Sequence, residues 1–86
     1  MPGVQIGTVS HFFDHIHVAA LALTGTIRVG DTVHFLGHST DFKQEVTSLQ
    51  VEHKAIQEAK AGDDVAMEVA QQVHPNDKVF RITEEG

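Results

Sequence analysis

The stretch LTGTIRVGDTVHFLG, from Leu23 to Gly37, carries the strongest signals for the fold. Apolar and polar residues alternate from Ile27 to Val29 and again from Val33 to Phe35. Such alternation places apolar side chains on one face of an extended strand. Gly30-Asp31 separates the two runs and has the composition of a turn. The stretch therefore predicts two short strands joined by a tight turn, whose edges the remaining strands join.

Extended runs separated by turn residues fill most of the remaining chain. We expect strands over residues 4–13, 17–23, 42–53, 65–69 and 78–82, with a β-bulge near Thr47-Ser48 in the long one. Lys54–Ala61 has helix-friendly composition but is too short for a stable helix, so we expect a loop with at most one helical turn. This pattern predicts an all-β fold, a small closed antiparallel β-barrel of about six or seven strands, because closure removes exposed sheet edges.

Composition indicates one globular domain. The chain has 86 residues, of which 41% are hydrophobic and 21% charged. We expect a single domain over residues 1–86, with a core over about residues 4–82 and a flexible acidic tail at residues 83–86. No run approaches the roughly 20 apolar residues of a membrane span, and the N-terminus does not resemble a signal peptide. We therefore expect a cytoplasmic monomer with no membrane partner.

The charge balance bears on the kind of partner. The net charge is −6 at pH 7, which disfavours non-specific binding of nucleic acid because phosphate contacts require a basic surface. The chain also has seven histidines, so full protonation would change the charge to −6 + 7 = +1. Cysteine is absent, which excludes disulfides and thiolate metal sites.

A cluster of aromatic and ionisable residues stands out near the N-terminus. His15 and His17 would lie on one side of a strand, and His11 would approach them across a hairpin with Asp14 nearby. His11, His15 and His17 are thus a candidate site for a divalent metal ion, although side chains that decorate a solvated hairpin end are the simpler explanation of the pattern. We expect no cofactor.

Phe12 and Phe13 are consecutive, so on a strand one of them must face away from the core. An exposed phenylalanine beside histidines can stack on a nucleic-acid base or anchor a protein partner, unless another segment covers it. The candidate binding residues are therefore His11, Phe12, Phe13, Asp14, His15 and His17.

The sequence has only weak signals for a catalytic site. Neither Ser10 nor Ser39 lies in a nucleophile turn of the G-x-S-x-G type. Asp63-Asp64 falls in an expected turn and Glu84-Glu85 in the expected tail, so neither pair is held at a catalytic separation. We expect a protein that is not an enzyme.

Four segments together resemble the second domain of translational GTPases, the β-barrel that follows the G domain in elongation factor Tu. They are GTV at Gly7–Val9, the stretch Leu23–Gly37, AKAGDDVAMEV at Ala59–Val69 and NDKVFRI at Asn76–Ile82. The resemblance covers nearly the whole chain, and it extends to small stand-alone proteins described as translation elongation factor-like. It implies the barrel fold and a translation-associated role.

The chain also departs from that family. It has no G-x-x-x-x-G-K-[ST] phosphate loop, so we expect no GTP binding or hydrolysis of that kind. Thr24 stands where these factors commonly carry arginine, and His15-Ile16-His17 replaces a glycine-rich segment. The resemblance therefore assigns no residue of this chain to contact with aminoacyl-tRNA. We expect a non-catalytic binding module that contacts RNA or a ribonucleoprotein, or alternatively a protein–protein interaction adaptor; the sequence does not name the partner.

Overall fold

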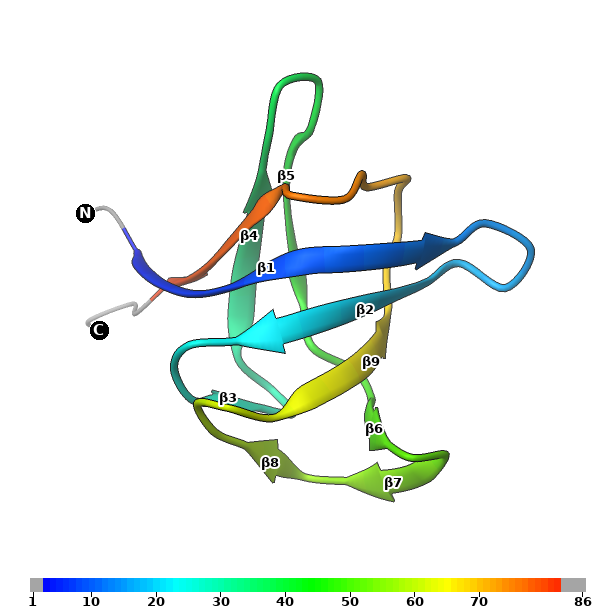
Figure 1. Cartoon of the computed structure of the whole chain (residues 1–86). Coiled ribbons are helices and arrows are strands. Elements are labelled where there is room, and N and C mark those ends of the chain that lie inside the picture. The colour runs from blue at the N-terminus through cyan, green and yellow to red at the C-terminus, as the bar shows by residue number, and fades with distance from the viewer. Residues whose placement is uncertain (1–2, 83–86) are drawn as a thin grey trace.

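The computed structural model describes residues 3–82, which form an all-β fold (Figure 1). The strands are β1 (Val4–Phe13), β2 (Val18–Leu23), β3 (Ile27–Arg28), β4 (Thr32–Leu36), β5 (Asp41–Glu45), β6 (Leu49–Val51), β7 (Lys54–Ile56), β8 (Glu58–Ala59), β9 (Asp64–Glu68) and β10 (Lys78–Ile82). Within residues 3–82 there is no helix long and apolar enough to cross a membrane. The expected acidic tail at residues 83–86 lies outside the described residues.

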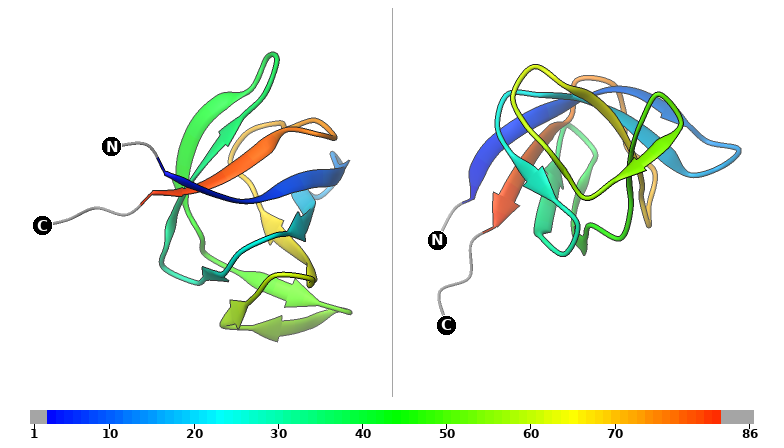
Figure 2. Two further views of the ribbon diagram at one scale, coloured as in Figure 1. Left: turned by 60° about the vertical axis from the view of Figure 1, so that its left-hand side comes forward. Right: turned by 90° about the horizontal axis from the view of Figure 1, so that it is seen from below.

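Strand pairing is antiparallel throughout the described residues. Eight strands form one sheet in the order β5-β4-β10-β1-β2-β9-β6-β7, and β3 pairs with β8 in a separate two-stranded sheet. The views in Figure 2 show the main sheet curling round on itself, with the N- and C-terminal strands β1 and β10 side by side. The all-β antiparallel architecture expected from the sequence is therefore confirmed.

The hydrogen-bonded pairing of the main sheet does not close into a barrel within residues 3–82. In the described part of the chain no hydrogen-bonded pairing connects β7 back to β5, so these two strands are the edges of the main sheet. The sequence predicted a closed barrel of about six or seven strands. The difference arises because β3 and β8 leave the main sheet and because the expected long strand over residues 42–53 is divided.

The two runs within Leu23–Gly37 do not form the expected hairpin. β3 pairs with β8, whereas β4 pairs with β10 and β5. The Gly30-Asp31 turn is present: Arg28 N donates to Asp31 Oδ2 at 3.0 Å, and Asp31 N donates to Arg28 O at 3.1 Å. This turn acts as a corner that sends the chain from one sheet to the other, with Ile27 and Val33 still buried in the same core.

The expected bulge near Thr47-Ser48 is instead a break in the strand. β5 ends at Glu45 and pairs with β4, and β6 begins at Leu49 and pairs with β9 and β7. Val46 N donates to Asp31 O at 2.8 Å, which keeps the end of β5 beside the start of β4. Phe42, Val46 and Leu49 are all buried, so the break brings these residues to one side, as a bulge would have done.

Lys54–Ala61 is not the predicted loop but contains β7 and β8. Val51 pairs with Lys54, and Glu52 and His53 between them have φ angles of 53° and 67°. Two consecutive residues with positive φ in a two-residue connection form a type I′ hairpin turn. The sequence did not reveal it, because Glu-His lacks the Asn or Gly that this turn favours.

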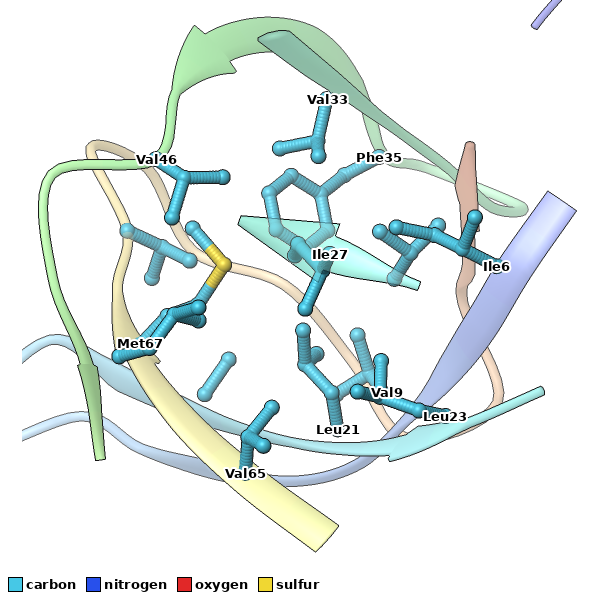
Figure 3. Close-up of a cluster of buried hydrophobic side chains, with 14 of the residues drawn as sticks. Ile6, Val9, Leu21, Leu23, Ile27, Val33, Phe35, Val46, Val65 and Met67 are labelled. Carbon is cyan, nitrogen blue, oxygen red and sulfur yellow. The ribbon is translucent and has the colours of Figure 1, made fainter. Parts of the chain in front are cut away.

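Buried side chains from both sheets meet in one core (Figure 3). Alternate residues of β2 and β9 point inward, as their sequence patterns predicted. Val4–Phe13 is the expected strand, and its register shifts between Gln5 and Gly7. A Cβ atom at Gly7 would lie 2.6 Å from Ala22 O, so the close approach of β1 and β2 requires glycine there.

Candidate functional site

The end of the β1–β2 hairpin projects beyond the rest of the sheet (Figure 1). We call residues 11–17 the hairpin tip. Phe13 pairs with Val18, and residues 14–17 form the turn that was expected around Asp14. A register shift between Val9 and His11 interrupts the β1–β2 ladder just before the tip. Such a shift increases local twist and re-aims the side chains that follow it.

The two phenylalanines of the tip face different surroundings, as their consecutive positions predicted. Phe12 is half-buried and packs against the core, with the His17 ring at 6.2 Å between centroids. Phe13 is 45% exposed and its ring lies 4.4 Å from that of His11. Ile16, in the turn, is 63% exposed. The tip thus presents one aromatic and one aliphatic side chain to solvent.

The histidines of the tip are not gathered into a ligand set. His11 lies beside Phe13, while His17 lies beside Phe12. His15 is fully exposed, 3.9 Å from Asp14 Oδ1. Among residues 3–82 no group of three or more histidine, aspartate or glutamate side chains is placed to hold a metal ion. The structure therefore does not bring together the metal ligands expected at His11, His15 and His17.

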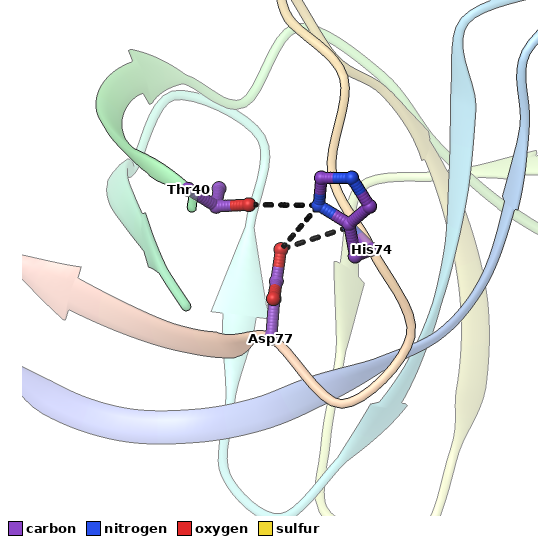
Figure 4. Close-up of polar contacts among 3 residues, drawn as sticks. All are labelled: Thr40, His74 and Asp77. Atoms are coloured by element: carbon purple, nitrogen blue, oxygen red, sulfur yellow. Dashed lines mark hydrogen bonds and ion pairs between the residues drawn. The ribbon is translucent and has the colours of Figure 1, made fainter. Parts of the chain in front are cut away.

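A second polar cluster joins the β4–β5 loop to the segment before β10 (Figure 4). Thr40 and Asp77 are buried, and both approach the same nitrogen of His74: Nδ1 lies 3.2 Å from Thr40 Oγ1 and 3.8 Å from Asp77 Oδ2. Asp77 Oδ2 also accepts a hydrogen bond from His74 N at 2.8 Å. In a catalytic triad the nucleophile and the acid engage opposite ring nitrogens, so this cluster has the geometry of a structural clamp.

The serines considered as nucleophiles have ordinary surroundings. Ser10 Oγ donates to Ala20 O at 3.1 Å across the β1–β2 pair. Ser39 is an exposed residue of the β4–β5 loop. Among residues 3–82, no hydrogen bond joins either serine to a histidine, the partner that activates a catalytic serine.

A cleft of about 370 Å³ lies beside the open β5 edge of the main sheet, between β5 and the end of β9. We call it the seam cleft; it is lined by His17, Gln44, Glu45, Thr47, Glu68, Val69 and Ala70. Gln44 lies in β5, while Glu68 ends β9. The Gln44 carboxamide joins the two sides: Nε2 donates to Glu68 O at 2.9 Å, and Oε1 accepts from Ala70 N at 2.7 Å. Sequence reasoning did not identify this cleft, because its two sides lie far apart in the chain.

Comparison with known proteins agrees with the fold. Residues 18–71 match the family described as elongation factor Tu domain 2. A protein of Methanocaldococcus jannaschii named an uncharacterized protease is 32% identical over 82 residues, which are 94% of this chain and 20% of that protein. The chain thus spans about a fifth of the length of this curated relative.

Two solved structures have the same fold. The C-terminal domain of a candidate U32 peptidase from Geobacillus thermoleovorans superposes with a TM-score of 0.86 and 19% identity, over 94% of this chain and 93% of that one. Its selenomethionine variant gives a TM-score of 0.84 at 20% identity, over 88% and 96%. These relatives carry peptidase names, so they do not support the translation-associated role that the sequence resemblance implied.

Proposed function

Because the chain belongs to the elongation factor Tu domain 2 family, we propose that it is a non-catalytic binding module that docks onto a partner polypeptide through the hairpin tip. The observation that carries the proposal is the exposure of Phe13 and Ile16, 45% and 63%, at the end of a projecting hairpin. Large apolar side chains of this kind anchor protein interfaces by filling pockets on the partner. The acidic charge of the chain, −6, also fits a protein partner better than a polyphosphate.

The relatives suggest the class of partner. The matching region is a fifth of the length of the Methanocaldococcus protein, and the Geobacillus structure is a C-terminal domain. We propose that this module accompanies a peptidase-type polypeptide and contributes recognition rather than bond cleavage.

RNA contact is the second candidate, and the His11–Phe13 ring pair at 4.4 Å favours it. A partly exposed aromatic ring beside an imidazole is a platform on which a base can stack. The two candidates differ in salt dependence: phosphate contacts weaken steeply as salt is added, whereas an apolar protein contact does not.

The test is capture of partners from extract of the source organism, with and without RNase. The double variant Phe13→Ser/Ile16→Ser removes both apolar side chains, and Val4→Ser is the matched control, because Val4 is 57% exposed at the other end of β1. We expect the original protein and the control to retain the same polypeptide regardless of RNase and salt, and the double variant to lose it. Equal capture by the double variant would contradict docking through the tip. Loss of capture on RNase treatment would favour RNA instead.

A further inference from the structure

The seam cleft separates two stretches of backbone that no strand pairing within residues 3–82 joins. On one side, Val46 exchanges backbone hydrogen bonds with Gly30 and Asp31. Because backbone polar groups alternate in direction along a strand, the N–H and C=O of the neighbouring Glu45 point the opposite way, into the cleft. On the other side, Val69 N donates to His17 O at 2.9 Å, which turns the polar groups of Glu68 and Ala70 away from β2. Both walls therefore present backbone polar groups to the cleft.

The side-chain amide of Gln44 hydrogen-bonds to backbone groups on both walls. The Gln44 carboxamide donates to Glu68 O at 2.9 Å and accepts from Ala70 N at 2.7 Å, while Nε2 also lies 3.3 Å from Glu45 O. In a parallel pairing, the N–H and C=O of one residue of the adjacent strand make the same pair of bonds, a donated N–H and an accepted C=O, to residues two apart in the chain. Gln44 thus occupies the position of a missing strand with a single amide.

The charge of the cleft indicates what side chains an occupant would carry. Glu45 and Glu68 are both exposed and line the cleft. In the described part of the chain neither carboxylate is paired with a lysine or arginine. Alternate side chains of a strand point to one face, so an extended segment in the cleft can direct every second residue toward these carboxylates.

From these observations we infer that the seam cleft is a binding site for an extended peptide segment with basic side chains. The segment adds to the open edge of the sheet and takes over the hydrogen bonds of the Gln44 carboxamide, which swings outward. Main-chain hydrogen bonds supply the affinity of such strand addition, and contacts of alternate side chains supply the selectivity. This site is separate from the exposed Phe13 and Ile16 of the hairpin tip and does not depend on the docking proposed there.

The experiment titrates the isotope-labelled protein with a capped synthetic peptide, Val-Lys-Val-Lys-Val, and follows backbone amide signals by NMR. We expect the largest shifts at Glu45 and at Glu68–Ala70, with Phe13 and Ile16 unmoved. A peptide with glutamate in place of lysine should bind about tenfold more weakly, because attraction is exchanged for repulsion. Methylation of alternate peptide nitrogens should abolish binding, because it removes the donors.

Gln44→Ala separates binding from a purely structural role for the amide. Removing the internal competitor should tighten binding of the lysine peptide about fivefold. Gln57→Ala, at an exposed glutamine between β7 and β8, is the matched control and should leave affinity unchanged. Shifts confined to other surfaces, equal binding of the glutamate peptide, or weaker binding by Gln44→Ala would each overturn the inference. If Gln44→Ala does not fold, the mapping on the original protein with the methylated peptide decides the question alone.

Retained binding by Phe13→Ser/Ile16→Ser distinguishes this site from the exposed apolar side chains of the hairpin tip. We expect that double variant to bind the lysine peptide with unchanged affinity. Loss of peptide binding in this variant would assign the peptide to the tip and refute the seam site.

Discussion

A methyl group at Gly37 should disrupt the clamp formed by Thr40, His74 and Asp77. A Cβ atom built there would overlap Asp77 Oδ1 and lie 2.5 Å from Asp77 Cγ. Asp77 is only 5% exposed, so its carboxylate has little room to retreat without leaving its place. The Gly37→Ala substitution therefore forces out a buried side chain that accepts a hydrogen bond from His74 N at 2.8 Å.

The size of the effect follows from the bond that is lost. A hydrogen bond to a charged group contributes roughly 1.5–3 kcal/mol, so Gly37→Ala should lower the free energy of unfolding by about 2 kcal/mol. For a domain of this size that corresponds to a fall of about 10 °C in Tm. Asp77→Ala removes the same acceptor and should cost a similar amount. Once Asp77 has been truncated, the methyl group at Gly37 no longer meets a carboxylate.

The double variant Gly37→Ala/Asp77→Ala tests this reasoning. We expect it to lose about 2 kcal/mol rather than the sum of the single losses, because both substitutions remove one contact. The chain has no tryptophan or tyrosine, so urea unfolding should be followed by far-UV circular dichroism rather than fluorescence. Losses that add to within about 0.5 kcal/mol would refute the steric link between Gly37 and Asp77.

Further expectations concern the core, a strained turn and the hairpin tip. Leu21→Ala should lower the free energy of unfolding by about 2–5 kcal/mol in the same assay, because Leu21 is fully buried. Leu36→Ala, at a residue 38% exposed, should cost under about 1 kcal/mol; equal losses would contradict the burial argument. His53→Gly should raise the stability by about 0.5–1 kcal/mol, since φ is 67° there, and a lower Tm would contradict this. Phe13→Ser/Ile16→Ser should change the stability by no more than about 0.5 kcal/mol, and a larger loss would mean that the tip supports the fold.

Side-chain periodicity predicts which residues are buried more reliably than it predicts which strands pair. Ile27 and Val33 are both buried, as their alternation indicated. Their strands nevertheless lie in different sheets, because β3 pairs with β8 and β4 with β10 and β5. Periodicity is a local property of each segment. Pairing depends on partners far along the chain, and the Gly30-Asp31 turn is compatible with either a hairpin or a corner.

The candidate sites likewise differ in how far the local sequence could predict them. Two consecutive phenylalanines in a strand require that one face away from the core, but the pattern did not indicate that this would be Phe13 or that no other segment would cover it. The seam cleft could not be predicted, because Gln44 and Ala70 are 26 residues apart. The same holds for Thr40 and His74, which are 34 apart. A polar residue in a strand carries no local signal of the backbone that its side chain will reach.

The break at residues 46–48 explains both the failed prediction and the seam cleft. Because β5 stays with β4 while β6 moves to β9, the only β6–β9 partners in the described residues are Gln50 and Ala66. In the described residues, the end of β9 therefore has no strand paired with it on the side facing β5. The side-chain amide of Gln44 hydrogen-bonds to the backbone groups there instead. A continuous ladder would satisfy these backbone groups without a side-chain amide and would leave no cleft. Positions where local patterns and the fold disagree are often functional, which makes this break a better guide to a second binding surface than any motif in the sequence.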